Sequence, residues 1–111
     1  MTNKSEIIAK LNDQVRKNLF DWRSNHKIVM TPGVYKEPFS NAILNAVKDF
    51  DDFNESNDPY KEHDFGQFYV NNMKYFWKID YYDNSMKYGS EDPSNPKITK
   101  RLLTIMRADE Y

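Results

Sequence analysis

Aromatic residues recur through the stretch from residue 65 to residue 82, and this pattern constrains the fold more than any other feature. Residues 67–70 and 73–82 are predicted to form two strands, because aromatic and β-branched side chains favour a pleated, half-buried surface. Asn71 and Asn72 between them tolerate the positive φ angles of a tight hairpin. One face of the second strand carries no charge and is expected to face the core; it holds Tyr75, Trp77, Ile79 and Tyr81.

Two amphipathic helices are predicted on the N-terminal side of this hairpin. In residues 5–22 the apolar side chains follow each other at intervals of three or four, namely Ile8, Leu11, Val15, Leu19 and Trp22. In residues 38–53 the same spacing links Phe39, Ile43, Val47 and Phe50, and Pro38 suits the first helical position. Such stripes are typical of helices that pack on a core.

The remaining segments complete a single domain over residues 1–111. Residues 27–34 read as a brief strand that ends in a turn at Pro32-Gly33. Order returns over residues 98–106, where the apolar run 102–106 reads as a buried strand, although periodicity alone also permits a helix there. Residues 51–64 and 84–97 are predicted loops. The order α-β-α-β-β-β predicts an α+β fold, with two helices on one face of a small antiparallel sheet of three to four strands.

Charge and composition narrow the function classes. The net charge of −1 indicates neither nucleic-acid nor membrane binding, and the absence of cysteine excludes disulfides and thiolate metal sites. The N-terminus lacks the apolar region of a signal peptide, and no run approaches the roughly 18 apolar residues of a membrane span. We therefore expect a cytoplasmic protein with no membrane partner.

Acidic residues are concentrated in one segment. Residues 49–64 contain seven acids and one lysine, a local charge of −6, so the rest of the chain carries +5. The segment is either a solvated loop or an acidic face for a basic partner. In the second interpretation the contact residues are Asp51, Asp52, Glu55, Asp58, Glu62 and Asp64.

His63-Asp64 is the pair best suited to chemistry. A histidine titrates near neutral pH and can act as a general acid or base, and Asp64 or Asp58 can orient its ring. The pair is equally suited to bonding loop amides at the entry to a strand, with Gly66 allowing a bulge or a close backbone approach. The sequence provides no other catalytic set, since it has no cysteine, no nucleophile-elbow motif and no phosphate loop.

Two further kinds of site have weaker support. Asp58, Glu62 and Asp64 offer oxygen ligands to a divalent cation, but their spacing does not match a calcium loop. No metal or cofactor is therefore assigned. The hairpin aromatics offer a stacking platform for single-stranded nucleic acid, yet only Lys74 and Lys78 are interleaved with them, so direct nucleic-acid binding is not expected.

Several blocks, taken in order, resemble one family. They are Leu11-Asn12-Asp13 with Arg16; Thr31-Pro32-Gly33-Val34; Asn57-Asp58-Pro59 with His63-Asp64-Phe65-Gly66; the run from Trp77 through Lys78 and Asp80 to Asp83; Asp92-Pro93; and Thr99, Arg101 to Met106 and Glu110-Tyr111. The chain resembles domain-of-unknown-function family 3768, small bacterial proteins with a His-Asp-Phe-Gly motif, often encoded on plasmids, prophages and phages. The resemblance implies a mobile-element setting, and therefore the cytoplasm of a bacterial host, and it implies no assigned activity. Lys100 departs from it.

The first functional hypothesis is a non-enzymatic binding protein of a mobile element that inhibits or modulates a host protein. The target would be a host protein or a protein–nucleic-acid complex, such as a CRISPR or restriction defence complex, engaged through the acidic surface. The second is a small enzyme or ligand-binding domain centred on His63 and Asp64. The third is a single-strand nucleic-acid binder that uses the outer face of the hairpin, where Phe76 and Tyr82 lie.

Overall fold

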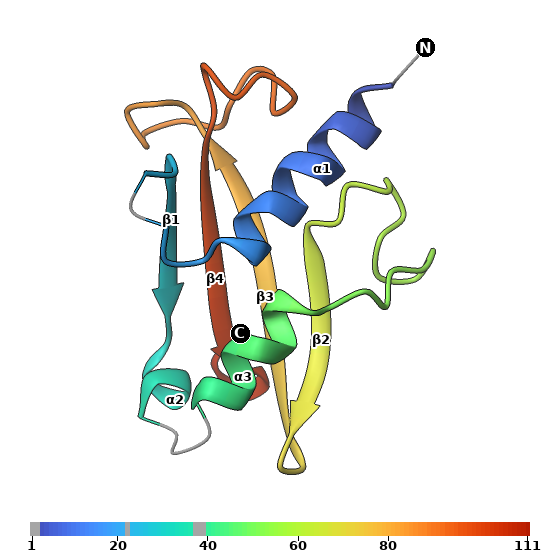
Figure 1. Ribbon diagram of the computed structural model, residues 1–111, viewed down its shortest axis with the longest axis vertical. Coiled ribbons are helices and arrows are strands. Elements are labelled where there is room, and N and C mark those ends of the chain that lie inside the picture. The colour runs from blue at the N-terminus through green and yellow to red at the C-terminus, as the bar shows by residue number, and fades with distance from the viewer. Residues whose placement is uncertain (1–2, 22, 37–39) are drawn as a thin grey trace.

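A four-stranded sheet with helices on one face forms the body of the protein. The computed structural model describes residues 3–21, 23–36 and 40–111. Along the chain the elements are α1 (Lys4–Lys17), β1 (His26–Met30), α2 (Pro32–Tyr35), α3 (Ser40–Lys48), β2 (Phe65–Val70), β3 (Met73–Tyr82), β4 (Lys100–Arg107) and a final 3-10 turn, η1 (Ala108–Glu110). Figure 1 shows α1 crossing the upper half of the sheet and α3 lying below it, both on the viewer's side.

The strand order in the sheet is β1-β4-β3-β2. β2 and β3 form the predicted hairpin, and Asn71 and Asn72 have φ angles of 51° and 66°, the conformation that a two-residue turn requires. β3 also pairs antiparallel with β4, whereas β1 pairs parallel with β4. The sheet is therefore mixed rather than wholly antiparallel. A parallel neighbour is available to β1 because α2, α3 and the hairpin separate it from β4 in sequence.

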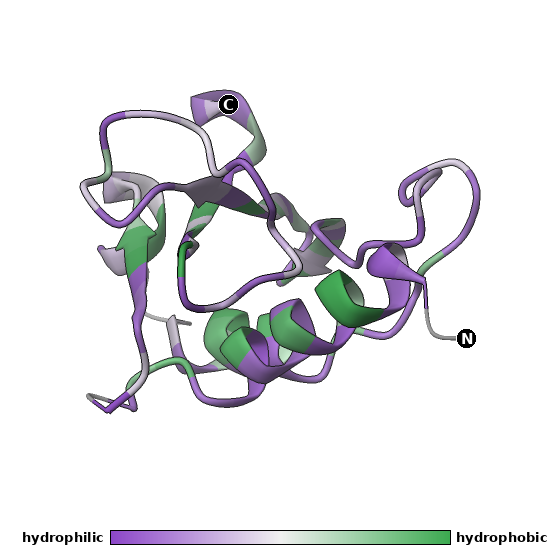
Figure 2. Cartoon of the chain, turned by 90° about the horizontal axis from the view of Figure 1, so that it is seen from above, coloured by the Kyte–Doolittle hydropathy of each residue, from purple (hydrophilic) through white to green (hydrophobic). Residues whose placement is uncertain are grey.

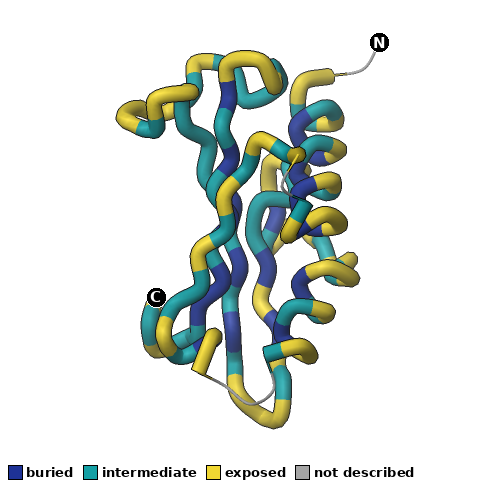
Figure 3. The backbone as a smooth tube through the Cα atoms, turned by 60° about the vertical axis from the view of Figure 1, so that its left-hand side comes forward, coloured by how far each residue is buried: buried dark blue, intermediate teal, exposed yellow. Residues whose placement is uncertain are grey.

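The core lies between the helices and one face of the sheet. The face of β3 predicted to be buried is confirmed, since Tyr75, Trp77 and Ile79 are at most 3% exposed, while Tyr81 at the end of the strand is half-buried against the core. Leu103 and Ile105 of β4 are fully buried beside them, and α3 contributes Ile43 and Val47. Figure 3 shows both helices on one side of the sheet and the C-terminus on the other. Viewed from above, the connecting loops are mostly hydrophilic (Figure 2).

Both long helices are shorter than predicted. α1 begins at an N-cap, Asn3, whose side chain accepts a bond from the Glu6 N–H, and it ends at Asn18, whose backbone leaves the helical region. Leu19 is still buried, so the apolar stripe continues beyond the helix. α3 covers only residues 40–48, and the predicted helical positions Trp22, Pro38 and Phe39 lie outside the described residues.

The segment after β1 also differs from the prediction. Strand β1 ends at Met30, and residues 32–35 form the short helix α2 in place of a simple turn. The C-terminal apolar run is a strand, β4, as predicted. Glu110 then ties the chain end to α2, because its carboxylate accepts bonds from the Thr31 hydroxyl (2.6 Å) and the Gly33 N–H (2.9 Å). These bonds, together with one from the Arg107 N–H, hold the pKa of Glu110 below its usual value.

Candidate functional site

His63 lies in a compact cluster where the acidic segment meets α1. We call Asp13, Arg16, Phe53, Asp58 and His63 the His63 cluster. The His63 ring is stacked flat on Phe53, with centroids 3.9 Å apart and planes inclined by 1°. Its Nδ1 lies 3.0 Å from Asp13 Oδ1 and donates to that carboxylate. The predicted orienting partners of the ring were Asp64 or Asp58, but Asp13 of α1 takes this role.

Asp58 holds the backbone that presents His63. Its side chain is buried, and Oδ1 accepts bonds from the Glu62 N–H (3.0 Å) and the His63 N–H (3.1 Å). Lys61 and His63 both have positive φ angles, near 59° and 57°, a strained conformation for residues other than glycine. The Asp58 carboxylate therefore stabilises a bend that the backbone alone disfavours.

Arg16 joins the same cluster to the end of α3. Its guanidinium is only 3% exposed; Nη1 donates to the carbonyls of Val47 and Phe50, and Nη2 donates to Asp13 Oδ1 at 2.7 Å. It also lies 5.0 Å from the Trp77 ring centroid. A cation is favourable near the C-terminus of a helix, where carbonyl groups lack helical partners. Asp13 thus neutralises a buried charge while it orients His63.

The chemistry available to His63 is limited. A surface cavity of about 480 Å³ adjoins the ring, and the second ring nitrogen lies 3.9 Å from Asp58 Oδ2, beyond hydrogen-bond distance. An aspartate–histidine pair beside a cavity is the arrangement of a general base. However, none of the described residues lining this cavity has a hydroxyl or thiol nucleophile. Nor do the described residues contain a group of three or more acids and histidines placed to hold a metal ion.

A second polar network connects α1 to the sheet through Asn12. Asn12 is fully buried, its Oδ1 accepts from Arg101 Nε (2.6 Å), and its Nδ2 donates to Tyr81 Oη (2.8 Å) and to the Glu62 carbonyl (2.9 Å). Tyr81 in turn donates to the Glu62 carboxylate at 3.0 Å. Burial is the main reason that the pKa of the Tyr81 hydroxyl is raised, so it stays a neutral donor.

The six acids predicted to bind a partner fall into two groups. Asp51, Asp52 and Glu55 are exposed on the loop that Figure 1 shows to the right of the sheet. Asp58 is buried in the His63 cluster, and Glu62 and Asp64 are half-buried with Glu62 bonded to Tyr81. Burial raises the pKa of Asp64, and the nearby charge of Glu62 adds to the effect. Of the six acids, only the first group offers free negative charge to a partner, and the neighbouring Asp49 is exposed as well.

The exposed part of the acidic segment has an ordered backbone. The Asn54 side chain accepts bonds from the N–H groups of Ser56 and Asn57. The Asn57 side chain accepts a bond from the Asn54 N–H through Oδ1 and donates one to the Asp52 carbonyl through Nδ2. Phe53 anchors the loop to the core through edge contacts with Phe50 and Trp77. Tyr60, the other aromatic residue of this segment, is 76% exposed and does not anchor it. We call residues 49–57 the acidic loop.

Gly66 is required by close packing. A Cβ atom built on it would lie 2.4 Å from Trp77 Nε1 and 2.6 Å from Phe50 Cζ, so only glycine leaves room for these rings. Its φ angle is not in the left-handed region. Of the two roles predicted for Gly66, a bulge or a close backbone approach, the structure shows the close approach. The ring that approaches its backbone is that of Trp77.

Among the described residues, α1, α2 and α3 all lie away from the opposite face of the sheet, but the C-terminal Tyr111 packs there, edge-on against Phe76 with ring centroids 5.3 Å apart. Strand alternation and register place Phe65 on this face next to Lys78, and Lys78 pairs with Asp80 of its own strand at 3.2 Å. We call it the open face, and its members are Lys27, Val29, Phe65, Gln67, Tyr69, Lys74, Phe76, Lys78, Asp80, Tyr82, Lys100, Leu102, Thr104 and Met106. It carries four lysines against one acid.

Sequence reasoning assigned no role to Asn12, Asp13 or Arg16. A signal was present, because Asn12 and Arg16 stand four residues apart and continue the helical spacing from Ile8. Polar residues within an apolar stripe indicate buried partners elsewhere in the chain. Which partners they would be depends on the pairing of β3 with β4, and the spacing within α1 contains no information about that.

Comparisons with known proteins place the chain in a family. A search of curated proteins found no match, and a search of solved structures found none either. No helix among the described residues is long and apolar enough to cross a membrane. The family model described as "Protein of unknown function (DUF3768)" matches residues 30–110, which include the acidic loop, the hairpin and β4. The chain therefore belongs to this family, whose members have no assigned activity.

Proposed function

We propose that the protein is a non-enzymatic binding protein of a mobile genetic element, which modulates a host protein or protein–nucleic-acid complex through its acidic loop. The observation that carries the proposal is the anchoring of Phe53 beneath exposed Asp51, Asp52 and Glu55. A loop whose backbone is already ordered loses little conformational entropy on binding, so its charges contribute more of their attraction to affinity.

The proposed target surface is basic. Four exposed carboxylates on one loop match the charge of a phosphate backbone and can occupy a groove that normally holds nucleic acid. A host defence complex is a target of this kind. Binding of this type is strengthened by long-range attraction and weakens as salt rises.

The test is affinity purification from a bacterial lysate with a charge-neutralising variant. The triple substitution Asp51→Asn, Asp52→Asn and Glu55→Gln keeps side-chain shape and removes three charges. The control triple, Glu6→Gln, Glu91→Gln and Asp109→Asn, removes three exposed charges elsewhere. We expect the first variant to bind the captured protein roughly tenfold or more weakly, because exposed ion pairs contribute up to about 1 kcal/mol each.

The control triple should bind like the wild type, and wild-type affinity should fall with added salt. Equal capture by both variants, or capture that salt does not change, would exclude the acidic loop as the contact surface. Failure to retrieve any specific protein from the host lysate would contradict the proposal as a whole.

A second candidate function, single-stranded nucleic-acid binding, is favoured by the open face. Phe65 and Phe76 lie side by side with centroids 5.4 Å apart, and Lys74 Nζ lies 5.3 Å from the Phe76 centroid. Aromatic rings interleaved with cations suit stacked bases and their phosphates. The test is fluorescence anisotropy with a labelled oligothymidylate at low salt. Phe76→Ala with Tyr82→Ala should abolish a signal that Tyr60→Ala with Tyr88→Ala retains; no wild-type signal excludes this candidate.

A further inference from the structure

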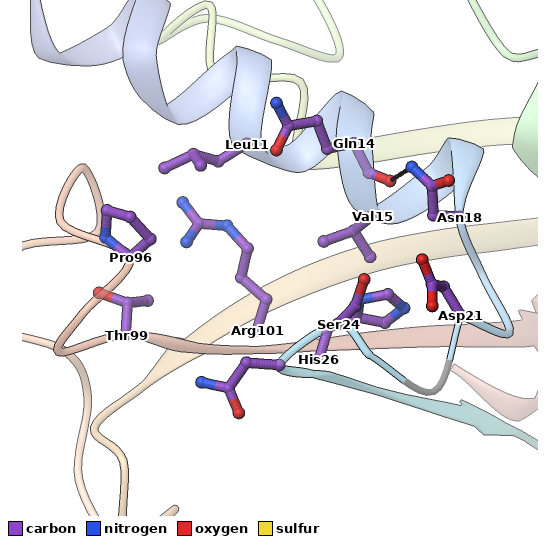
Figure 4. Close-up of a pocket in the computed structure, with 11 residues that line it drawn as sticks. Leu11, Gln14, Val15, Asn18, Asp21, Ser24, His26, Pro96, Thr99 and Arg101 are labelled. Atoms are coloured by element: carbon purple, nitrogen blue, oxygen red, sulfur yellow. Dashed lines mark hydrogen bonds between the residues drawn. The ribbon is translucent and has the colours of Figure 1, made fainter.

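A cavity of about 260 Å³ lies between the C-terminal half of α1 and the first residues of β1 and β4 (Figure 4). This volume is just below the roughly 300–1,000 Å³ of pockets for drug-sized ligands. α1 contributes Gln14 and Val15 to the wall, the segment before β1 contributes Ser24 and Asn25, and Arg101 enters from β4. The acidic loop and the open face do not contribute to it.

Arg101 is a buried cation with no described carboxylate in direct contact, although the charge of nearby Glu62 acts on it from a longer distance. It is only 5% exposed, and both of its bonds go to neutral oxygens: Nε donates to Asn12 Oδ1 and Nη2 to the Pro93 carbonyl, each at 2.6 Å. Its guanidinium also lies 5.1 Å from the Tyr81 ring centroid. Among the described residues no acid forms an ion pair with it, and the Glu62 carboxylate is bonded by Tyr81 instead.

The other buried arginine, Arg16, has the carboxylate partner that Arg101 lacks. Arg16 is equally buried and has the Asp13 carboxylate at 2.7 Å. A guanidinium stays charged at neutral pH, and a buried charge is costly unless it is paired. Three of the five N–H groups of Arg101, including both on Nη1, have no partner among the described residues. Arg101 therefore has both the charge and the donors for an anion.

Charged side chains are distributed unevenly around the cavity wall. Figure 4 shows the guanidinium of Arg101 at one end, between Leu11 and Pro96, and shows Asp21, Ser24 and His26 at the other. Asp21 is already bonded by Arg23, at 3.1 Å from Nε, and His26 Nε2 donates to the Leu19 carbonyl. An anionic group would be attracted to the Arg101 end and kept from the Asp21 end, which fixes the orientation of a ligand.

We propose that this cavity is a binding site for a small molecule with a terminal oxyanion, a carboxylate or a phosphate, held by Arg101. The planar guanidinium matches two oxygens of either group through paired N–H donors. Leu11, Val15 and Pro96 would contact the uncharged remainder of the ligand. The site is independent of the proposed partner-binding loop, so each can fail without the other.

The test is nuclear magnetic resonance titration of the isotope-labelled full chain with inorganic phosphate and, separately, acetate. Sodium chloride at matched ionic strength controls for general screening. Saturating shifts at the Arg101 Nε–H and at the amides of Ser24, Asn25 and Thr99 support the site. Saturation by one probe alone identifies whether phosphate or carboxylate is the preferred group.

A variant that keeps Arg101 and blocks the site avoids the risk of unfolding. Gln14 is exposed on α1 and lines the cavity, so Gln14→Glu places a negative charge at its wall with almost no change in shape. We expect probe binding to weaken at least about tenfold, because like charges a few ångströms apart repel. The matched control, Gln67→Glu on the open face, should bind as the wild type does. Shifts that never saturate, that chloride reproduces, or that survive in Gln14→Glu would overturn the proposal.

Discussion

The ring of His63 lies flat against the ring of Phe53, with 3.9 Å between their centroids. Phe53 belongs to the acidic loop, and His63 belongs to the segment that enters β2, so this one contact joins the two ends of residues 53–63. Arg16 of α1 lies 5.3 Å from the Phe53 centroid. The motif histidine therefore helps to hold the acidic loop against the helical layer.

Phe53→Ala is expected to lower the free energy of unfolding by about 2 to 4 kcal/mol, since a half-buried phenylalanine contributes somewhat less than a core one. It should also release the acidic loop, because the loop loses its contacts with His63, Phe50 and Trp77. Urea denaturation measures the first effect and amide hydrogen exchange of residues 52–58 the second. Tyr60→Ala, at an exposed ring nearby, should change neither; equal loss in both variants would contradict the anchoring role.

Asn12→Ala is expected to destabilise the fold by about 2 to 4 kcal/mol, because it leaves the buried Arg101 N–H without its acceptor and the Glu62 carbonyl without its donor. The control is Asn45→Ala on α3, where the side chain is exposed and alanine has the higher helix propensity. That variant should be neutral or slightly more stable in thermal unfolding. A small effect at Asn12 would mean that the network adds little to the packing of α1.

The local pattern of the hairpin was sufficient to predict its turn and its core face, whereas the strand at the C-terminal run was predicted from its length and composition, with a helix left open. Alternation with period two reports directly which residues share a face, and two adjacent asparagines suit a tight turn. The parallel pairing of β1 with β4 was not predictable in this way. This pairing joins two strands that are separated by about 70 residues, and the sequence of either strand alone does not indicate its partner.

The candidate site was predicted only in part, for a related reason. His63, Asp58 and the exposed acids stand in one segment, so composition and turn residues revealed them. Their partners Asp13 and Arg16 lie on a helix about 50 residues earlier, and their contacts exist only after α1 has packed across the sheet. Asp58 and Glu62 were grouped with the exposed acids because a run of charge does not distinguish solvated carboxylates from those that bond the backbone.

Gly66→Ala tests the close packing of β2 on the aromatic core. Its Cβ would lie 2.4 Å from Trp77 Nε1 and 2.6 Å from Phe50 Cζ, so the rings must move, and overpacking of this kind costs about 1 to 3 kcal/mol. Gly89→Ala is the matched control, since the nearest atom to its Cβ, the Tyr81 carbonyl oxygen, is 3.9 Å away. Thermal unfolding should show a clear loss for the first variant and almost none for the second. Equal melting temperatures would mean that the core accepts the methyl group without strain.

Asp64→Asn tests whether the charged carboxylate of Asp64 lowers the stability of the folded protein at neutral pH. Burial, and next the charge of Glu62, raise the pKa of Asp64 in the folded protein, so the folded state binds a proton more tightly than the unfolded chain. Stability from this group is therefore fully present below the ordinary aspartate pKa of about 3.9 and is lost as pH rises through the higher folded value. The amide side chain of the variant is neutral at every pH. The variant should thus gain stability over the wild type as pH rises from below about 4 to neutrality, as measured by urea denaturation at a series of pH values.

The control, Asp52→Asn, removes one exposed charge from the same segment. A variant that is less stable than the wild type at neutral pH would show instead that the Asp64 carboxylate makes favourable contacts in its charged form.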